Sequence, residues 1–418
     1  MTATTDADLR ALDEAIDHDQ LVEDVRLLVD CRSDDGDETA VQLLVAQVAE
    51  RLGLLVQVDE EDLFQLRQEP DCPGEEVHRE RLLSVSATVP GREPGAPRLV
   101  INGHIDVAPP GAEPWTTPAF RSDVRDGRLY GRGAADMKSG VVAALHAAAA
   151  VKTVFGGARG DVVVQSVAGE EDGGIGTWAA LRRDADFAGC LITEPTGGTL
   201  VCATAGALTW RLRVTGVSAH ACHRLDGVSA LDRYLPVHAA LRALEDRINR
   251  DVEHPLMREL RLPYPLSVGT VAAGDWPSNV PGELVCEGRL GIAVGSSLTE
   301  ARAEFEATVE ASVDVDGGRP EISWTGGQFA SAQIDEEHPL VHLVSVAVEQ
   351  VVAERPRRAG VPYGSDMRQF TERGVPTVLY GPGSIRDAHC VDESVALAEI
   401  SDGVRVLARA AVGFSGGR

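Results

Sequence analysis

Two ionisable side chains stand two residues apart where an apolar run ends. The segment LVINGHIDVAPPG places His104 and Asp106 after the apolar residues that begin at Leu99. Residues two apart in a strand face the same side, so we expect both side chains on one face at the carboxyl end of a strand. A histidine bound to zinc commonly donates its other ring proton to a carboxylate. A lone H-x-D pair is also typical of a solvated loop end, and this segment alone leaves both interpretations open.

Carboxylates and a second histidine follow other apolar or glycine-rich segments. Asp136 lies in LYGRGAADMKSG, where it can either cap the following helix or bridge two metal ions. Glu170 and Glu171 end the run SVAGEE, and adjacent strand residues face opposite sides, so one can bind metal while the other faces the reaction space. An acidic turn is the alternative there. Glu194 lies in LITEPTGG and His389 in GPGSIRDAHCVDE.

Two histidines and several carboxylates thus recur near the ends of successive apolar segments. Open α/β sheets build their sites where successive strands end. A ligand set of nitrogen and oxygen atoms suits zinc, cobalt or manganese rather than an iron–sulfur cluster. Phosphate-loop, H-E-x-x-H and C-x-x-C patterns are absent from the sequence, which removes common rival sites.

The elements that must position these residues alternate between strand and helix. Residues 6–54 have helical periodicity, interrupted by the turn-like SDDGDE. Apolar strands are expected at 81–89, 98–107 and 161–169, with an alanine-rich helix at 139–155. This alternation predicts an α/β fold with a mixed, mostly parallel sheet flanked by helices.

A second pattern interrupts the first. From residue 207 to 325 the expected order is strand, helix, strand, strand, helix, strand, which is that of a ferredoxin-like βαββαβ plait. After it, HPLVHLVSVAVEQVVA and VPTVLYGPG return to the α/β pattern. We therefore predict a discontinuous catalytic domain at 1–206 and 326–418 with an inserted lid domain at 207–325.

Composition excludes several classes of partner. The 418 residues carry a formal net charge of −26, which would repel nucleic acid and anionic membranes.

The N-terminal residues lack the basic and apolar regions of a signal peptide, so we expect a cytoplasmic protein. Seven cysteines without a C-x-x-C pair fit reduced thiols, and Cys390 is expected only to pack.

Eight short motifs extend this interpretation across nearly the whole chain. GHIDVAPPG, GRGAADMKSG, GEEDGG, TEPT, SAHA, SNVP, YGSDMRQF and GPG followed by AH occur in that order. In these motifs the chain resembles the di-zinc metallohydrolases that include acetylornithine deacetylase, succinyl-diaminopimelate desuccinylase, aminoacylase and glutamate carboxypeptidase. The resemblance implies a zinc-peptidase-like catalytic domain with two zinc ions per subunit.

The resemblance also implies a role for each matching residue. His104 and Glu194 would bind one ion, Glu171 and His389 the other, and Asp136 both. A cis peptide would follow Asp136. The remaining metal-site roles go to Glu170 as the general base and Asp106 as a neighbour that supports the ligands.

The lid domain contributes further residues by the same resemblance. His220 in SAHA would reach the site of a partner subunit and steady the oxyanion, which implies a homodimer through the lid. Asn279 in SNVP would occupy a similar position. Arg289 and Arg368 would hold a substrate carboxylate, although each alone also fits a surface salt bridge.

The expected activity is hydrolysis of an amide bond that removes a small acyl group from an N-acyl amino acid or related amine. TEPT favours deacetylases and desuccinylases over aminoacylases. The segment GDWPSNVPGELVCEGRLG resembles a deacylase branch that includes a bacterial formylaminopyrimidine deformylase, so the acyl group and the amine both stay open. A dipeptidase or carboxypeptidase of the same mechanism is the first alternative, and a catalytically silent metal-binding protein is the second.

Overall fold

A computed structural model describes residues 5–313 and 319–416. The chain divides into two compact units. The first comprises Met1–Cys202, Gln333–Ala359 and Asp366–Arg418, and the second comprises Ala203–Ala332 and Gly360–Ser365. The second unit extends beyond the expected lid range at both ends and also takes in a short segment near residue 360. Residues 1–4, 314–318 and 417–418 of the expected domains lie outside the described residues.

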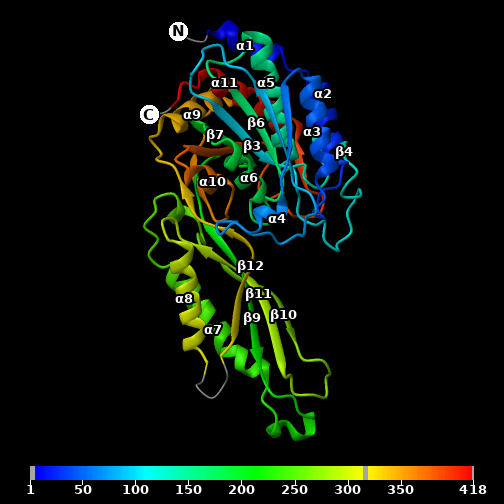
Figure 1. Ribbon diagram of the computed structural model, residues 1–418, viewed down its shortest axis with the longest axis vertical. Coiled ribbons are helices and arrows are strands. Elements are labelled where there is room, and N and C mark those ends of the chain that lie inside the picture. The colour runs from blue at the N-terminus through cyan, green and yellow to red at the C-terminus, as the bar shows by residue number, and fades with distance from the viewer. Residues whose placement is uncertain (1–4, 314–318, 417–418) are drawn as a thin grey trace. The chain divides into compact units, whose positions relative to one another are not determined.

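A large mixed sheet forms the centre of the first unit (Figure 1). Its strand order is β1-β2-β6-β3-β7-β15-β8-β13, with β14 paired to β8. The four central strands β6, β3, β7 and β15 are parallel to one another, whereas the pairs β1–β2, β2–β6 and β15–β8 are antiparallel. The strands are β1 (Leu55–Glu60), β2 (Leu83–Val89), β3 (Leu99–His104), β6 (Val162–Val167), β7 (Gly189–Pro195), β8 (Leu200–Thr204), β13 (Ala332–Gln333), β14 (Arg358–Val361) and β15 (Thr377–Gly381).

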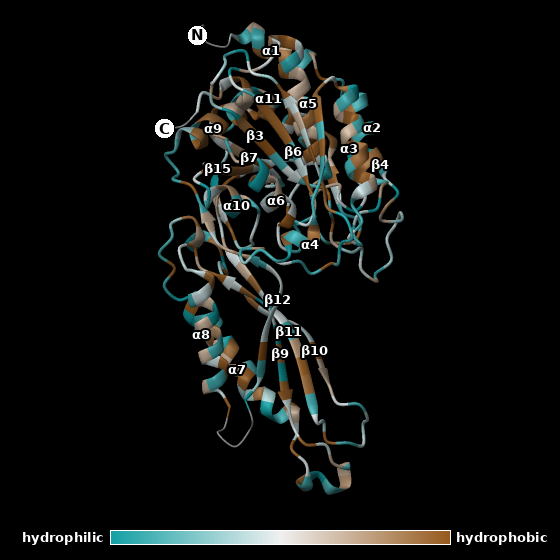
Figure 2. Ribbon diagram, in the orientation of Figure 1, coloured by the Kyte–Doolittle hydropathy of each residue, from teal (hydrophilic) through white to brown (hydrophobic). Residues whose placement is uncertain are grey.

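Helices cover this sheet. The longest is α5, whose small alanine side chains let it pack on β3 and β6 and against α11. A glycine in the left-handed conformation, Gly156 with φ 70°, ends α5. The helices of this unit are α1 (Asp6–Glu14), α2 (His18–Val29), α3 (Thr39–Arg51), α4 (Leu63–Leu66), α5 (Lys138–Phe155), α6 (Ile175–Arg183), α9 (Pro339–Val352), α10 (Met367–Thr371) and α11 (Leu397–Gly413). Figure 2 shows apolar residues along the central strands, while the helices alternate apolar and polar residues.

A small three-stranded sheet joins two distant parts of the same unit. Strand β5 (Arg128–Tyr130) pairs with β4 (Asp123–Arg125) on one side and with β16 (Ser394–Ala396) on the other. Because the central strands of the large sheet are parallel and helices cover it, the predicted α/β class with a mostly parallel sheet is confirmed.

The second unit has the predicted ferredoxin-like order. Its sheet runs β10-β11-β9-β12, and each pair of neighbouring strands is antiparallel. Its elements are β9 (Gly206–Thr215), the short 3-10 helices η1 (Ala221–Asp226) and η2 (Met257–Glu259), α7 (Ala230–Ile248), β10 (Leu266–Ala273), β11 (Glu283–Ile292), α8 (Leu298–Ala311) and β12 (Glu321–Phe329). Serine side chains cap both long helices, Ser229 at α7 and Ser297 at α8.

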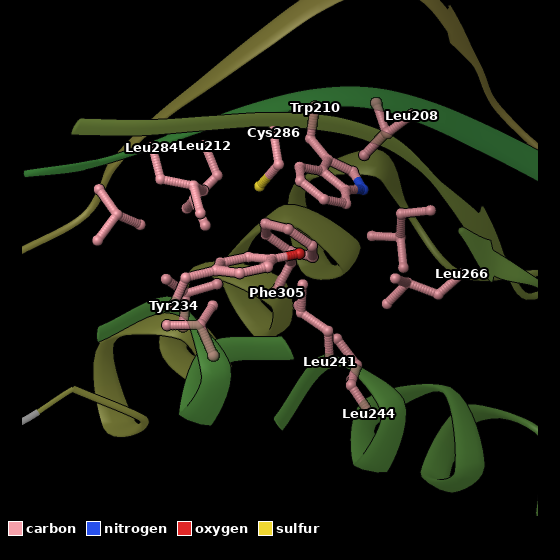
Figure 3. Close-up of a cluster of buried hydrophobic side chains, with 14 of the residues drawn as sticks. Leu208, Trp210, Leu212, Tyr234, Leu241, Leu244, Leu266, Leu284, Cys286 and Phe305 are labelled. Carbon is pink, nitrogen blue, oxygen red and sulfur yellow. The ribbon is translucent and has the colours of Figure 1, made fainter. Parts of the chain in front are cut away.

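An aromatic core fills the space between this sheet and its helices (Figure 3). Trp210 points from the sheet toward Phe305 of α8, and their ring centres lie 5.2 Å apart. Tyr234 and Leu241 reach the same cluster from α7. Burying side chains of this size supplies a core that belongs to the second unit alone.

Two strand ends differ from the sequence expectation. Strand β3 stops at His104, so Asp106 lies in the following loop and not on the strand. Strand β6 stops at Val167, and Glu170 and Glu171 lie in the loop before α6. Within the described residues, no helix combines the length and apolarity that a bilayer crossing requires.

Candidate metal centre

The five predicted metal ligands come together from separate segments of the first unit. They form two groups that share one member, and in each group the candidate ligand atoms lie within 4.8 Å of one another. One group contains His104, Asp136 and Glu194, and the other contains Asp136, Glu171 and His389. His104 and Glu194 stand at the ends of the neighbouring parallel strands β3 and β7, while the other three residues lie in loops.

Asp136 presents one carboxylate oxygen to each histidine. Its Oδ1 lies 3.2 Å from Nε2 of His104, and its Oδ2 lies 3.6 Å from Nε2 of His389. Each histidine also faces a second carboxylate, because Glu194 Oε1 lies 3.8 Å from His104 Nε2 and Glu171 Oε1 lies 2.9 Å from His389 Nε2. This arrangement matches two adjacent cation sites with a shared carboxylate.

The ring of His104 is oriented by the backbone. Its Nδ1 lies 2.8 Å from the carbonyl oxygen of Asp106, which can only accept a hydrogen bond, so Nδ1 carries the proton. Nε2 then faces Asp136 and Glu194, and its lone pair would be available to a cation in the neutral imidazole. This is the orientation that a metal-binding imidazole adopts.

The Asp106 side chain braces the segment of a neighbouring candidate ligand, as a residue that supports the ligands is expected to do. Its Oδ2 accepts a hydrogen bond from the backbone N–H of Glu171 at 3.0 Å, whereas its Oδ1 lies 3.6 Å from His104 Nδ1. Because β3 ends at His104, Asp106 lies just beyond the strand, and its carboxylate still stays close to the ring of His104. Asp106 therefore connects the segment of one candidate ligand to the segment of another.

Asp136 is not the N-cap that its position before a helix suggests. The capping residue of α5 is Met137, and no side chain accepts a hydrogen bond there. The peptide between Asp136 and Met137 is cis, as the resemblance implies. Asp136 Oδ1 is buried and makes no hydrogen bond to any described residue. A bound cation would satisfy that oxygen, so the residues present fit a divalent metal ion.

The electrostatics of the centre also favour a cation. Burial raises the pKa of Glu170 well above the usual carboxyl range, and the nearby Glu194 carboxylate raises it further. Burial, followed by the charge of Asp136, raises the pKa of Glu194 in the same way. The hydrogen bond to Glu171 raises the pKa of His389 to about 9. A bound cation would stabilise the ionised carboxylates that burial otherwise disfavours.

Three predicted residues belong to the second unit. His220 and Asn279 form an isolated β-bridge. His220 is exposed, and its Nδ1 accepts a hydrogen bond from the backbone N–H of Cys222 at 3.2 Å. Arg289 is exposed on β11, with its guanidinium 5.7 Å from the ring centre of Phe329. Their contributions to substrate binding and to the oxyanion stay predictions.

Arg368 lies in the first unit and is buried, with 3% of its surface exposed. Its Nη2 donates to the carbonyl oxygen of Gly173, in the loop that carries Glu170. The Asp366 and Glu170 carboxylates lie near its guanidinium. The open alternative of a surface salt bridge is therefore wrong for Arg368, and binding of a substrate carboxylate stays a prediction.

A buried arginine, not predicted from the sequence, supports the acidic loop, which carries Glu170, Glu171 and Asp172. Arg79, 2% exposed, lies 2.9 Å from Glu38 and 2.8 Å from Asp172. Asp172 follows the Glu170–Glu171 pair directly and also accepts the backbone N–H of Val77 at 2.8 Å. The motif GEEDGG contained the signal for Asp172, whereas nothing in the polar segment around Arg79 indicated burial.

Comparison with known proteins identifies the family of this chain. The model of peptidase family M20/M25/M40 matches residues 100–412. A succinyl-diaminopimelate desuccinylase of Methylococcus capsulatus is 31% identical over 74% of this chain and 81% of that protein. An N-formyl-4-amino-5-aminomethyl-2-methylpyrimidine deformylase of Halalkalibacterium halodurans is 29% identical over 72% of this chain and 75% of that protein.

Solved structures show the same fold. A dipeptidase from Saccharomyces cerevisiae superposes with a TM-score of 0.76 at 14% identity, covering 97% of this chain and 98% of that one. A dinuclear metal-binding peptidase from Bacillus subtilis superposes with a TM-score of 0.62 at 15% identity, covering 94% and 97%.

Replacing Arg79 by methionine tests the buried support of the acidic loop. Arg79→Met leaves the carboxylates of Glu38 and Asp172 buried without their cation, so the free energy of unfolding should fall by about 3–5 kcal/mol. Urea denaturation followed by circular dichroism measures the loss. Arg81→Met is the matched control, because Arg81 is exposed and pairs with Glu60 at the surface, and it should scarcely change the transition. Equal effects of the two substitutions would contradict this account.

Proposed function

Since this chain belongs to peptidase family M20/M25/M40, we propose that it hydrolyses the amide bond of an N-acyl amino acid or a related amine and releases a small acyl group. Membership of that family makes the chain a hydrolytic enzyme. The observation that carries the finer proposal is the pair of ligand groups that share Asp136, with the buried carboxyl group of Glu170 beside them.

We assign the two ligand groups to two divalent cations. His104 and Glu194 would hold one ion, Glu171 and His389 the other, and Asp136 would bind both. Zinc suits these nitrogen and oxygen donors best, and cobalt or manganese also suit them. When bound, the ions supply Lewis acidity that polarises an amide carbonyl and makes a water molecule more acidic.

Glu170 is our candidate for the general base. Its Oε2 lies 4.0 Å from Nε2 of His104, next to the site but outside both ligand groups. Burial raises its pKa, which makes the Glu170 carboxylate a stronger base than an exposed one. Glu170 would take a proton from the attacking water and deliver it to the nitrogen of the leaving amine.

The proposed substrate class follows the curated relatives. Their names describe removal of a succinyl group and of a formyl group from an amine. A chain with a net charge of −26 needs local positive charge to hold a substrate carboxylate, and Arg289 and Arg368 would supply it. A dipeptidase or carboxypeptidase of the same mechanism differs only in the group beyond the scissile bond.

We also propose that the enzyme acts as a cytoplasmic homodimer through its second unit. His220 would then steady the oxyanion in the site of the partner subunit, with Asn279 beside it. The exposure of His220 supports this assignment, because a residue that serves another subunit must be accessible in the single chain.

A substrate panel with a base variant tests the proposed reaction. The panel contains N-formyl, N-acetyl and N-succinyl amino acids together with dipeptides, and zinc-loaded enzyme should release amine from the N-acyl compounds, detected by mass spectrometry. Glu170→Gln should lower kcat/KM by about 10²–10⁴-fold while the metal content stays unchanged, because general acid–base catalysis contributes that much.

The control for the panel is Glu354→Gln, since Glu354 is exposed and lies outside both ligand groups. It should retain wild-type turnover. Turnover of dipeptides alone would replace the deacylase assignment by the peptidase alternative. Substantial hydrolysis by Glu170→Gln would show that another group is the base.

Mixing two inactive variants tests the shared site. His220→Ala should lower turnover by about 10²–10³-fold, the usual effect of losing an oxyanion donor. When His220→Ala and Glu170→Ala subunits exchange at random, half of the dimers are mixed and each has one intact site, so about a quarter of wild-type activity should return. Absence of rescue despite demonstrated subunit exchange would exclude a shared site.

A further inference from the structure

A second buried ion pair, between Arg132 and Glu393, contacts the backbone of the turn that carries Asp136. Arg132 is 1% exposed and Glu393 is fully buried. Nη1 of Arg132 donates to Oε2 of Glu393 at 2.5 Å. Neither residue belongs to the two ligand groups. Taking two charges out of water is costly, so a pair in this place calls for a reason beyond stability.

The carboxylate of Glu393 holds the turn that presents Asp136. Its Oε1 accepts hydrogen bonds from the backbone N–H groups of Ala135 at 3.0 Å and Asp136 at 3.1 Å. The backbone carbonyl of Glu393 accepts a third bond, from the N–H of Gly131 at 2.9 Å. Three backbone donors of the 131–136 turn therefore depend on one residue for their hydrogen bonds.

Glu393 also belongs to the segment that carries His389. The two residues are four positions apart, in the sequence HCVDE. Strand β16 begins immediately after Glu393, and its pairing with β5, at Ser394 with Tyr130, fixes the end of this segment. The shared carboxylate of Asp136 and the imidazole of His389 are thus connected through a single buried side chain.

Arg132 extends the connection to a third segment. Its Nη2 donates to the carbonyl oxygen of Pro109 at 3.2 Å, and its guanidinium lies 5.2 Å from the ring centre of Trp115. Pro109 follows His104 by five residues in the sequence. The ion pair therefore joins the segments of His104, Asp136 and His389 without contacting any of their ligand atoms.

We propose that Arg132 and Glu393 are positioning residues that set Asp136 opposite His389 and so determine how tightly the Asp136–Glu171–His389 group holds its cation. The inference rests on the metal-site assignment made under the proposed function. A carboxylate is needed at position 393 because it accepts two backbone N–H groups and the guanidinium at once. Partners that orient metal ligands in this way typically change metal affinity by about 10–100-fold when they are removed.

Calorimetric titration of the metal-free enzyme with Zn²⁺ tests the proposal without using activity. The wild-type enzyme should bind two ions. In Glu393→Gln, the amide nitrogen faces Arg132 as a second donor, so the pair is lost while the side-chain volume is kept. One of the two ions should then bind about 10–100-fold more weakly, and the other should change much less.

Arg132→Lys and Asp387→Asn complete the test. Arg132→Lys keeps a cation beside Glu393 but loses the guanidinium fork that reaches Pro109. It should therefore lower the affinity for the same ion. If Glu393→Gln does not fold, the affinity of Arg132→Lys decides between the outcomes. Asp387→Asn is the matched control: it lies in the same segment and pairs with Arg128 at 3.0 Å instead. It should keep both wild-type affinities.

The outcomes separate this inference from the proposed function. If wild-type enzyme binds two ions and both Glu393→Gln and Arg132→Lys bind them with wild-type affinity, the positioning role is wrong and the metal-site assignment stands. If wild-type enzyme binds fewer than two ions, the assignment itself fails and the positioning role fails with it.

Discussion

The buried carboxylate of Asp136 is the constraint on which the rest of the site depends. One of its oxygens faces each histidine, and Oδ1 makes no well-formed hydrogen bond within the described residues. A carboxylate in this position is costly unless positive charge compensates it. The surrounding residues add two further carboxylates and two imidazoles, which is a donor set for cations. The site is therefore arranged to be completed by metal ions.

The fold brings the donors together by two different means. The neighbouring parallel strands β3 and β7 end side by side and supply His104 and Glu194 through regular sheet geometry. Glu171 and His389 lie on loops, whose positions a sheet does not fix. Buried charged residues hold these loops. Arg79 pairs with Asp172 in the loop of Glu171, and Glu393 accepts a hydrogen bond from the backbone N–H of Asp136. Rigid strands and paired charges together give the ligands one geometry.

Much of this arrangement could be predicted from the sequence, because the signals were local. Apolar periodicity predicted the α/β sheet and the ferredoxin-like unit, and the motifs identified the five candidate ligands. The supporting role of Asp106 could also be predicted, whereas its actual partner, the backbone N–H of Glu171, could not, because Asp106 lies in the loop beyond β3. The supporting roles of Arg79 and Glu393 could not be predicted either, because they depend on contacts between distant parts of the chain. Their partners lie 93 and 261 residues away, and only the folded chain shows that such charged side chains are buried.

The most direct test of the account is an anomalous diffraction measurement at the zinc edge on crystals of the zinc-loaded enzyme. The account predicts two peaks about 3.5–4 Å apart, the usual spacing of a two-metal site, with one oxygen of Asp136 bound at each. His104 and Glu194 should flank one peak, and Glu171 and His389 the other. A single peak, or a second peak that Asp136 does not touch, would contradict the shared carboxylate on which the proposed chemistry depends.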